Sequence, residues 1–412
     1  MELVDIARNT NGMKFDLVQE LIRWQDEVLT LSRNLHAHPE VSFKEVKSAS
    51  EITALLEKGG FEVERGTSNI ATAFSASTGS GDLVVALCVE YDALPGVGHA
   101  CGHNLIAGAS VAAALALAPL ADHLGITVKA IGTPAEEHGA GKSVMLERGA
   151  FEGVHLAMMF HPVQEGQTAN PKGTGAQALG RYRAVFRGKA AHAAAAPHMG
   201  TNAADAAVIS QVAVGLLRQQ LPDDHRVGLF VKEAGDVTNI IPETSVVDFE
   251  CRAFTMDDFQ ALVPRVHQCF EGAAVATGAS LEISATQPVY ESLIQDEILA
   301  DGWTEAMASF GHDTSPSRGM SGGSTDMGNI SQVIPSLHPW LSIPGAQDPI
   351  HSSGFAEIAN TSSAYETMFE AAAALAFTTI DVAMSPKHRS HFIQYRTASR
   401  PSGEENRTCL NQ

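Results

Sequence analysis

Leu83-Val84-Val85-Ala86-Leu87-Cys88 is an unbroken apolar run, and the chain continues from residue 89 to residue 104 as VEYDALPGVGHACGHN. Such a run is typical of a strand buried on both faces of a sheet. Two further runs of this kind cover 126–131 and 156–160, and helical patterns lie between the runs at 105–124 and 141–148. Alternation of buried strands and helices predicts an α/β fold with a mostly parallel sheet.

From about Gly180 the pattern changes to that of a smaller, inserted domain. Strand and helix patterns follow one another in the order β-α-β-β-α-β, which indicates a ferredoxin-like open sandwich. The six segments are 181–187, 202–219, 227–232, 244–254, 257–277 and 280–284. We therefore predict a catalytic domain in two halves, an inserted domain, and a polar tail that we expect to be mobile. Their bounds are 1–178 and 292–384 for the halves, 179–291 for the insert and 385–412 for the tail.

Charge and cysteine content exclude several classes of protein. The 412 residues include 27 Lys and Arg against 47 Asp and Glu, a net charge of −20 that disfavours nucleic-acid and membrane-surface binding. The five cysteines are odd in number and irregularly spaced, which argues against a disulfide framework and for a reducing compartment. The N-terminus lacks the pattern of a secretion signal. We expect a cytoplasmic protein that acts on a small molecule.

Side chains with metal-binding chemistry follow each of the three buried runs. Glu90-Tyr91-Asp92 and Cys101-Gly102-His103 follow the first run, Glu136-Glu137 follows the second, and His161 follows the third. Because ligand sites of open α/β sheets form beyond the carboxyl ends of the strands, we expect these residues to converge. Thiolate, imidazole and carboxylate are ligands of divalent transition metals. The sequence therefore predicts a metal site at this edge of the sheet.

The paired carboxylates Glu136 and Glu137 suggest a division of labour. One of them can coordinate metal, and the other can take a proton from a water molecule whose pKa the metal lowers. The residues alone leave open which carboxylate does which. No phosphate-binding loop occurs in the sequence, so we exclude nucleotide binding.

These motifs resemble those of the aminoacylase and carboxypeptidase-like metallopeptidases. Within that clan the chain looks like the amidohydrolase branch that includes auxin-conjugate hydrolases and p-aminobenzoyl-glutamate hydrolase. The resemblance covers roughly 35–377. Its markers are Leu35–Glu40 with Ser42-Phe43, Asp92–Pro95, Cys101–His103, Pro134–Glu137, Gly188–His192, Asn239–Pro242 and His351.

The resemblance implies a centre of one or two divalent ions, zinc or manganese, in which a thiolate can bridge. The implied ligands are Cys101, His103, Glu137, His161 and His351. It also implies that Glu136 is the general base, which later protonates the leaving nitrogen. Asp92 matches an acidic position that suits a role in orienting the ligands.

For the inserted domain, the resemblance implies a lid and dimerisation domain. His192 matches a second catalytic residue, a donor to the developing oxyanion that often comes from across a subunit interface. Asn239 and Arg252 match lid positions that can hold the carboxylate of a substrate. The implied assembly is thus a homodimer or higher homo-oligomer formed through this domain.

The sequence departs from the family pattern at two places. Asn104 stands where many relatives carry Asp, so it can hydrogen-bond a ligand but brings no charge to the second ion. The segment 322–329, GGSTDMGN, replaces a Glu-Asp-Phe motif, and its Asp326 is either an extra ligand or a substrate contact. Together with 98–104 this segment looks most like the p-aminobenzoyl-glutamate hydrolase and dipeptidase-like subgroup.

We expect a metal-dependent amidohydrolase that cleaves the amide C–N bond of a small N-acyl or N-aroyl amino acid or a dipeptide. A first alternative is an aminohydrolase that releases ammonia from an electron-poor aromatic amine, because the same activated water can attack an aryl carbon. A second alternative is a non-catalytic metal-binding protein with this fold. The presence of both Glu136 and His192 disfavours the second alternative.

Overall fold

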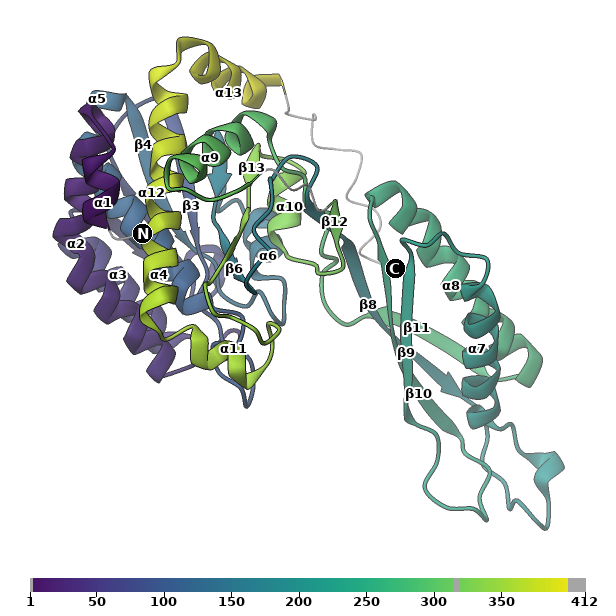
Figure 1. Cartoon of the computed structure of the whole chain (residues 1–412). Helices are drawn as coiled ribbons and strands as arrows, with labels where there is room; N and C mark the ends of the chain where they lie inside the picture. Colours follow the sequence, from purple (N-terminus) through teal and green to yellow (C-terminus); the bar gives the residue numbers. More distant parts are fainter. Residues whose placement is uncertain (1–2, 315–318, 399–412) are drawn as a thin grey trace. The chain divides into compact units, whose positions relative to one another are not determined.

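The computed structural model describes residues 3–314 and 319–398, and its contacts divide the chain into two compact units (Figure 1). Unit 1 comprises described residues within 1–175, 294–319 and 329–412, and unit 2 comprises 176–293 and 320–328. Residues 320–328 were predicted to belong to the catalytic domain, whereas their contacts place them in unit 2.

Unit 1 contains a six-stranded sheet in the order β1-β2-β4-β3-β5-β13. The strands β4, β3, β5 and β13 are parallel to one another, whereas β1 pairs with β2 and β2 pairs with β4 in antiparallel fashion. Their bounds are Glu62–Arg65 (β1), Phe74–Thr78 (β2), Leu83–Val89 (β3), Ile126–Gly132 (β4), Leu156–Met158 (β5) and Ser336–Leu337 (β13). A separate parallel pair joins β6 (His161–Val163) to β14 (Trp340–Ser342).

Helices cover the sheet of unit 1, and α4 lies at the centre of their packing. Every residue of α4 is buried, and α4 contacts β3, β4 and the helices α2 and α12 (Figure 1). The helices of unit 1 are α1 (Leu3–Arg8), α2 (Gly12–Ala37), α3 (Val46–Lys58), α4 (His103–Leu117), α5 (Ala121–Leu124), α6 (Gly141–Glu147), α9 (Glu297–Ser309), α11 (Ser353–Ile358), α12 (Ser362–Met384) and α13 (Pro386–Ala398). By length and composition 103–124 and 362–384 could cross a membrane, but most of each is buried in the structure, as in core helices.

Unit 2 is a four-stranded antiparallel sheet with two helices on one face. Its elements are β8 (Ala178–Arg187), α7 (Ala203–Arg218), β9 (Arg226–Glu233), β10 (Thr244–Ala253), α8 (Met256–Thr277) and β11 (Ser280–Ala285), and the sheet order is β11-β8-β10-β9. Alternate residues of β8 and β10 are buried because only one face of the sheet meets the helices. Stacked rings of Phe249 and Phe270, with centroids 4.4 Å apart, lie in that core.

The three apolar runs form the adjacent parallel strands β3, β4 and β5, which confirms the mostly parallel α/β sheet. The antiparallel strands β1 and β2 were not predicted. Three of the four β1 residues are exposed, so this strand lacks the apolar signal on which the prediction depended.

The expected mobile tail over 385–412 needs correction. Residues 386–398 form helix α13, in which Phe392 is fully buried. Arg389 donates a hydrogen bond of 3.0 Å to the carbonyl of Leu124, and it also pairs with Asp82. The polar composition of 386–398 concealed this helix, since the segment has few apolar residues. The rest of the predicted tail lies outside the described residues.

Candidate metal centre

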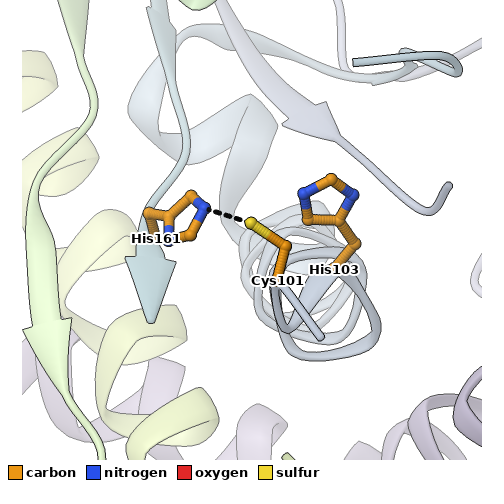
Figure 2. A group of neighbouring side chains, drawn as sticks. All are labelled: Cys101, His103 and His161. Carbon is orange, nitrogen blue, oxygen red and sulfur yellow. Dashed lines mark hydrogen bonds between the residues drawn. The ribbon is translucent and has the colours of Figure 1, made fainter. Parts of the chain in front are cut away.

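The centre of the site is the turn that leads into α4. Figure 2 shows the thiol of Cys101 between the rings of His161 and His103. Gly102 separates Cys101 from His103 and has a φ of +74°, and a Cβ atom there would lie 2.6 Å from Cγ of Pro162. Only glycine satisfies both conditions without movement, so Gly102 allows its two neighbours to approach β6.

Two groups of three potential ligands share the Cys101 thiol. Cys101, His103 and His161 form one group, and Cys101, Glu137 and His351 form the other. The Cys101 Sγ atom lies 3.3 Å from Nε2 of His161 and 3.5 Å from Nε2 of His351. All five metal ligands predicted from the sequence are therefore close together within unit 1.

A hydrogen bond to the backbone orients the imidazole ring of His161. His161 donates from Nδ1 to the carbonyl of Pro162 at 2.7 Å, which leaves Nε2 facing the thiol. Burial, followed by the charge of His103, lowers the pKa of His161 to about 4, so its ring is neutral at pH 7. A neutral imidazole with one free nitrogen is the form that binds metal.

His351 is the most exposed of the five predicted ligands, with 53% of its side chain accessible. Its φ of +68° lies in the left-handed region, which is unusual for a residue with a side chain. The backbone N–H of His351 donates to the carbonyl of Ala100 at 2.8 Å, and its Nε2 lies 3.5 Å from Oε1 of Glu137. This backbone link holds His351 beside the Cys101 turn.

Asp92 organises the loop that carries the two glutamates. Its Oδ1 accepts from the backbone N–H of Glu136 at 3.2 Å, and its Oδ2 accepts from that of Glu137 at 3.1 Å. Ser42 donates its hydroxyl to Oδ2 at 2.8 Å, and Nδ1 of His103 lies 3.3 Å from Oδ1. Burial alone would raise the pKa of Asp92, but the hydrogen bond and charge of His103 with these other donors hold it at about 2.

The donor set fits one or two divalent transition-metal ions. Oε1 of Glu137 is buried and has no hydrogen-bond partner among the described residues. Burial and the charge of Glu137 raise the pKa of the Cys101 thiol, so this position favours a thiolate only if a cation is present. Thiolate, imidazole and carboxylate together match the preferences of zinc and, less selectively, of manganese.

A buried ion pair next to these ligands was not predicted from the sequence. Glu90 pairs with Lys142, and both side chains are almost fully buried. The other oxygen of Glu90 lies 3.1 Å from Nε2 of His103. Burial alone would lower the pKa of His103, but Glu90 and Asp92 outweigh it and raise that pKa. The position of Glu90 directly after the first apolar run was the available signal.

His338 is a further buried histidine at this edge of the sheet. It follows β13, its ring centroid lies 5.8 Å from that of His161, and neither ring nitrogen has a hydrogen-bond partner among the described residues. Burial, followed by the charge of His161, lowers the pKa of His338. Its short strand could not be recognised from the sequence pattern.

His192 and Asn239 lie at one end of unit 2, beyond the paired ends of β8 and β10. His192 pairs with Ile240 in a bridge, and the N–H of Ala193 donates to the carbonyl of Asn239 at 2.9 Å. Nδ1 of the exposed His192 ring accepts from the N–H of Ala195 at 3.1 Å. A neutral His192 therefore carries its proton on Nε2, which makes that atom a hydrogen-bond donor.

Arg252 lies near the opposite end of unit 2, where it pairs with Leu179 of β8. Its Nε donates to Glu250 at 2.9 Å, and its Nη1 lies 3.3 Å from the carbonyl of Gly322. Asp326 is fully buried in the same unit. The predicted substrate contacts of Asn239, Arg252 and Asp326 stay predictions.

The side chain of Asn104 is buried and donates two hydrogen bonds, while its predicted role beside the ligands stays a prediction. Its Nδ2 donates to Ser32 Oγ at 3.1 Å and to the carbonyl of Ala359 at 3.0 Å. Ser32 belongs to α2, and Ala359 follows α11. The Asn104 amide thus joins α4 to two neighbouring segments.

Most of the chain matches a known family and two of its characterised relatives. The model of peptidase family M20/M25/M40 matches residues 86–376. Xaa-Arg dipeptidase of Mus musculus is 36% identical over 86% of this chain and 85% of its own length. One component of the p-aminobenzoyl-glutamate hydrolase of Escherichia coli K12 is 33% identical over 71% of this chain and 66% of its own length.

Solved structures show the same fold. A dinuclear metal-binding peptidase from Bacillus subtilis has a TM-score of 0.64 at 24% identity and covers 87% of this chain and 99% of its own. The aminobenzoyl-glutamate utilization protein of Klebsiella pneumoniae has a TM-score of 0.67 at 19% identity and covers 89% of this chain and 98% of its own.

Proposed function

Because the chain belongs to peptidase family M20/M25/M40, a family of hydrolases of peptide and amide C–N bonds, we propose that it cleaves a small N-acyl or N-aroyl amino acid or a dipeptide. The observation that carries this proposal is the pair of ligand groups that share Cys101, next to the loop with Glu136. The two relatives act, by their names, on Xaa-Arg dipeptides and on p-aminobenzoyl-glutamate, which fall within this substrate class.

We propose that Cys101, His103, Glu137, His161 and His351 hold one or two zinc or manganese ions. When bound, such ions polarise the substrate carbonyl and lower the pKa of a water molecule. Glu136 takes a proton from the attacking water and passes it to the leaving nitrogen. Asp92 supports this step because it holds the backbone N–H groups of Glu136 and Glu137.

Unit 2 is proposed as a ferredoxin-like lid that supplies His192 as a donor to the oxyanion and Asn239 and Arg252 as contacts to the substrate carboxylate. Along β10, eight residues separate Thr244 from Arg252, which corresponds to about 26 Å at the rise of an extended strand. His192 and Asn239 lie beyond the Thr244 end, whereas a dipeptide spans only about 7 Å. One chain therefore cannot bring both Arg252 and the pair His192 and Asn239 to the same small substrate, which favours His192 and Asn239 from a second subunit.

A homodimer or higher homo-oligomer through unit 2 is accordingly part of the proposal. Exposed apolar side chains recur on α7 at helical spacing, at Val208, Val212 and Leu216, as expected of a face that another chain covers. We also propose that the protein acts in the cytoplasm with a small-molecule substrate and without nucleic-acid or membrane partners, on the basis of its charge and cysteines.

The test is Glu136→Gln in enzyme loaded with zinc, assayed on Xaa-Arg dipeptides, p-aminobenzoyl-glutamate and N-acyl amino acids. We expect hydrolysis to fall by about 10²–10⁴-fold, the range for loss of a general base. The zinc content should match that of the wild type because Glu136 is not a proposed ligand. Glu305→Gln on the exposed face of α9 is the control and should keep full activity. Unchanged hydrolysis by Glu136→Gln would show that the assignment is wrong.

The same assay addresses the alternative of aryl deamination. Release of ammonia from an aromatic amine without cleavage of any amide in the panel would select an aminohydrolase. Cleavage of at least one amide by wild type and not by Glu136→Gln supports amide hydrolysis.

A further inference from the structure

Glu45 is a buried carboxylate that links the start of α3 to the loop with the two catalytic-site glutamates. Its side chain is fully buried, although the residue lies in a polar stretch of the sequence. Oε1 of Glu45 accepts from the backbone N–H of Phe43 at 2.9 Å and from that of Ala135 at 3.0 Å. One oxygen atom thus holds two segments that are 90 residues apart in the sequence.

Both residues that donate to Glu45 have an unfavourable backbone conformation. The φ angle is +63° at Phe43 and +62° at Ala135, in the left-handed region that residues with side chains rarely adopt. Such a conformation persists only where the surrounding structure imposes it, and it is common at active sites. Ala135 immediately precedes Glu136, so its backbone angles decide the direction in which Glu136 and Glu137 leave β4.

Further contacts hold the loop at 135–139 in place. The ring of Phe43 lies against Gly139, where a Cβ atom would come within 2.3 Å of the ring. The hydroxyl of Ser42 donates to Asp92, which binds the N–H groups of Glu136 and Glu137. The N–H of Gly141 closes the loop by a bond of 3.2 Å to the carbonyl of Ala135.

We propose that Glu45 is a positioning residue, which keeps the loop at 135–139 in the conformation that aims Glu136 at the reacting water and Glu137 at the metal. This inference rests on the proposed function. Glu45 itself touches neither substrate nor metal in this role. It acts by providing the acceptor for the N–H of Ala135, without which the left-handed conformation of Ala135 would relax.

The chain offers a matched control for the loss of a carboxylate acceptor. Glu40 lies five residues earlier and accepts from the N–H of Lys47 at 3.1 Å and from that of Ser48 at 2.8 Å. These donors belong to α3 and not to the loop at 135–139. Glu40→Ala therefore removes two backbone hydrogen bonds of the same kind from the same region.

The experiment compares Glu45→Ala, Glu45→Gln and Glu40→Ala with wild type as zinc-loaded full-length protein. Glu45→Ala should lower kcat by about 10–100-fold, the range for residues that orient metal ligands, with a change in KM below about threefold. Peptides that cover 134–141 should exchange backbone hydrogen faster. Glu45→Gln keeps an acceptor oxygen and should remain within about threefold of wild type in kcat, as should Glu40→Ala.

Several results would overturn the proposal. One is an equal kcat for Glu45→Ala and Glu40→Ala, and another is a Glu45→Gln variant as impaired as Glu45→Ala. Unchanged hydrogen exchange at 134–141 in Glu45→Ala would also do so. If Glu45→Ala does not fold, Glu45→Asp replaces it, since its shorter side chain weakens the contact to Ala135. Absence of amide hydrolysis by the wild type would refute the proposed function instead, and hydrogen exchange would still test the role of Glu45.

Discussion

Replacement of Asp92 by Asn tests how the buried carboxylate supports the metal centre. The four groups around Asp92 are all donors or potential donors, two on each oxygen. An amide keeps one acceptor oxygen and places an NH₂ group at the other position. If the NH₂ replaces Oδ2, the Ser42 hydroxyl can turn to accept from it, but the N–H of Glu137 loses its acceptor. If it replaces Oδ1, the N–H of Glu136 loses its acceptor and His103 must move its proton from Nδ1 to Nε2.

Either orientation of the amide leaves one buried backbone N–H without a partner, which costs about 1–3 kcal/mol. The affected N–H groups belong to the loop that carries Glu137. With the NH₂ group at the Oδ1 position, the proton of the His103 ring also moves to Nε2. We therefore expect Asp92→Asn to lower zinc affinity by about 10–100-fold, in line with the loss of other residues that orient metal ligands. Competition with a chromophoric chelator, at one fixed pH for all variants, measures this affinity.

Ser42→Ala provides the matched control because it removes one donor to Asp92 and leaves the carboxylate in place. We expect Ser42→Ala to lose about 1 kcal/mol, the free energy of one ordinary hydrogen bond. This loss would lower the zinc affinity by less than about tenfold. If Asp92→Asn binds zinc within twofold of the wild type, the hydrogen-bond reasoning is refuted. The same reasoning would be refuted if Asp92→Asn bound zinc as tightly as Ser42→Ala does.

Stability and its dependence on pH should respond to changes at three further buried positions. Gly102→Ala forces a Cβ into the left-handed region and against Pro162, so urea unfolding should show a loss of at least about 1–2 kcal/mol, with less zinc bound per chain. Phe270→Ala removes a fully buried ring from the core of unit 2 and should cost about 3–5 kcal/mol by the same measurement. Burial raises the pKa of Glu45 to about 7, so its contribution to stability is present below its unfolded pKa near 4.5 and is lost as the pH rises through about 7. Between about pH 5 and pH 8.5 wild type should therefore lose on the order of 3 kcal/mol relative to Glu45→Gln, and parallel stability curves for the two proteins would contradict this.

The sequence was sufficient for the strands and ligands that have strong local signals. Apolar runs such as Leu83–Val89 predicted the parallel strands, because a strand buried on both faces needs apolar side chains throughout. The motifs directly after these runs predicted Cys101, His103, Glu137 and His161 as candidate ligands, and the family resemblance added His351. The structure brings these five side chains close together. Short or exposed elements, such as β13 and β1, have no comparable pattern and were missed.

Local sequence thus determined which side chains are candidate metal ligands, and that three adjacent strands deliver most of them to one edge of a sheet. Asp92 was also predicted from the sequence, but only the tertiary structure showed the contacts of Glu45 and Lys142. The partners of these two residues lie far away in the sequence, at Ala135 and at Glu90. Likewise, only the folded structure shows that the Nδ2 atom of Asn104 donates to Ser32 and to the carbonyl of Ala359. A hydrogen bond depends on the positions of both partners, and those positions exist only after the chain has folded.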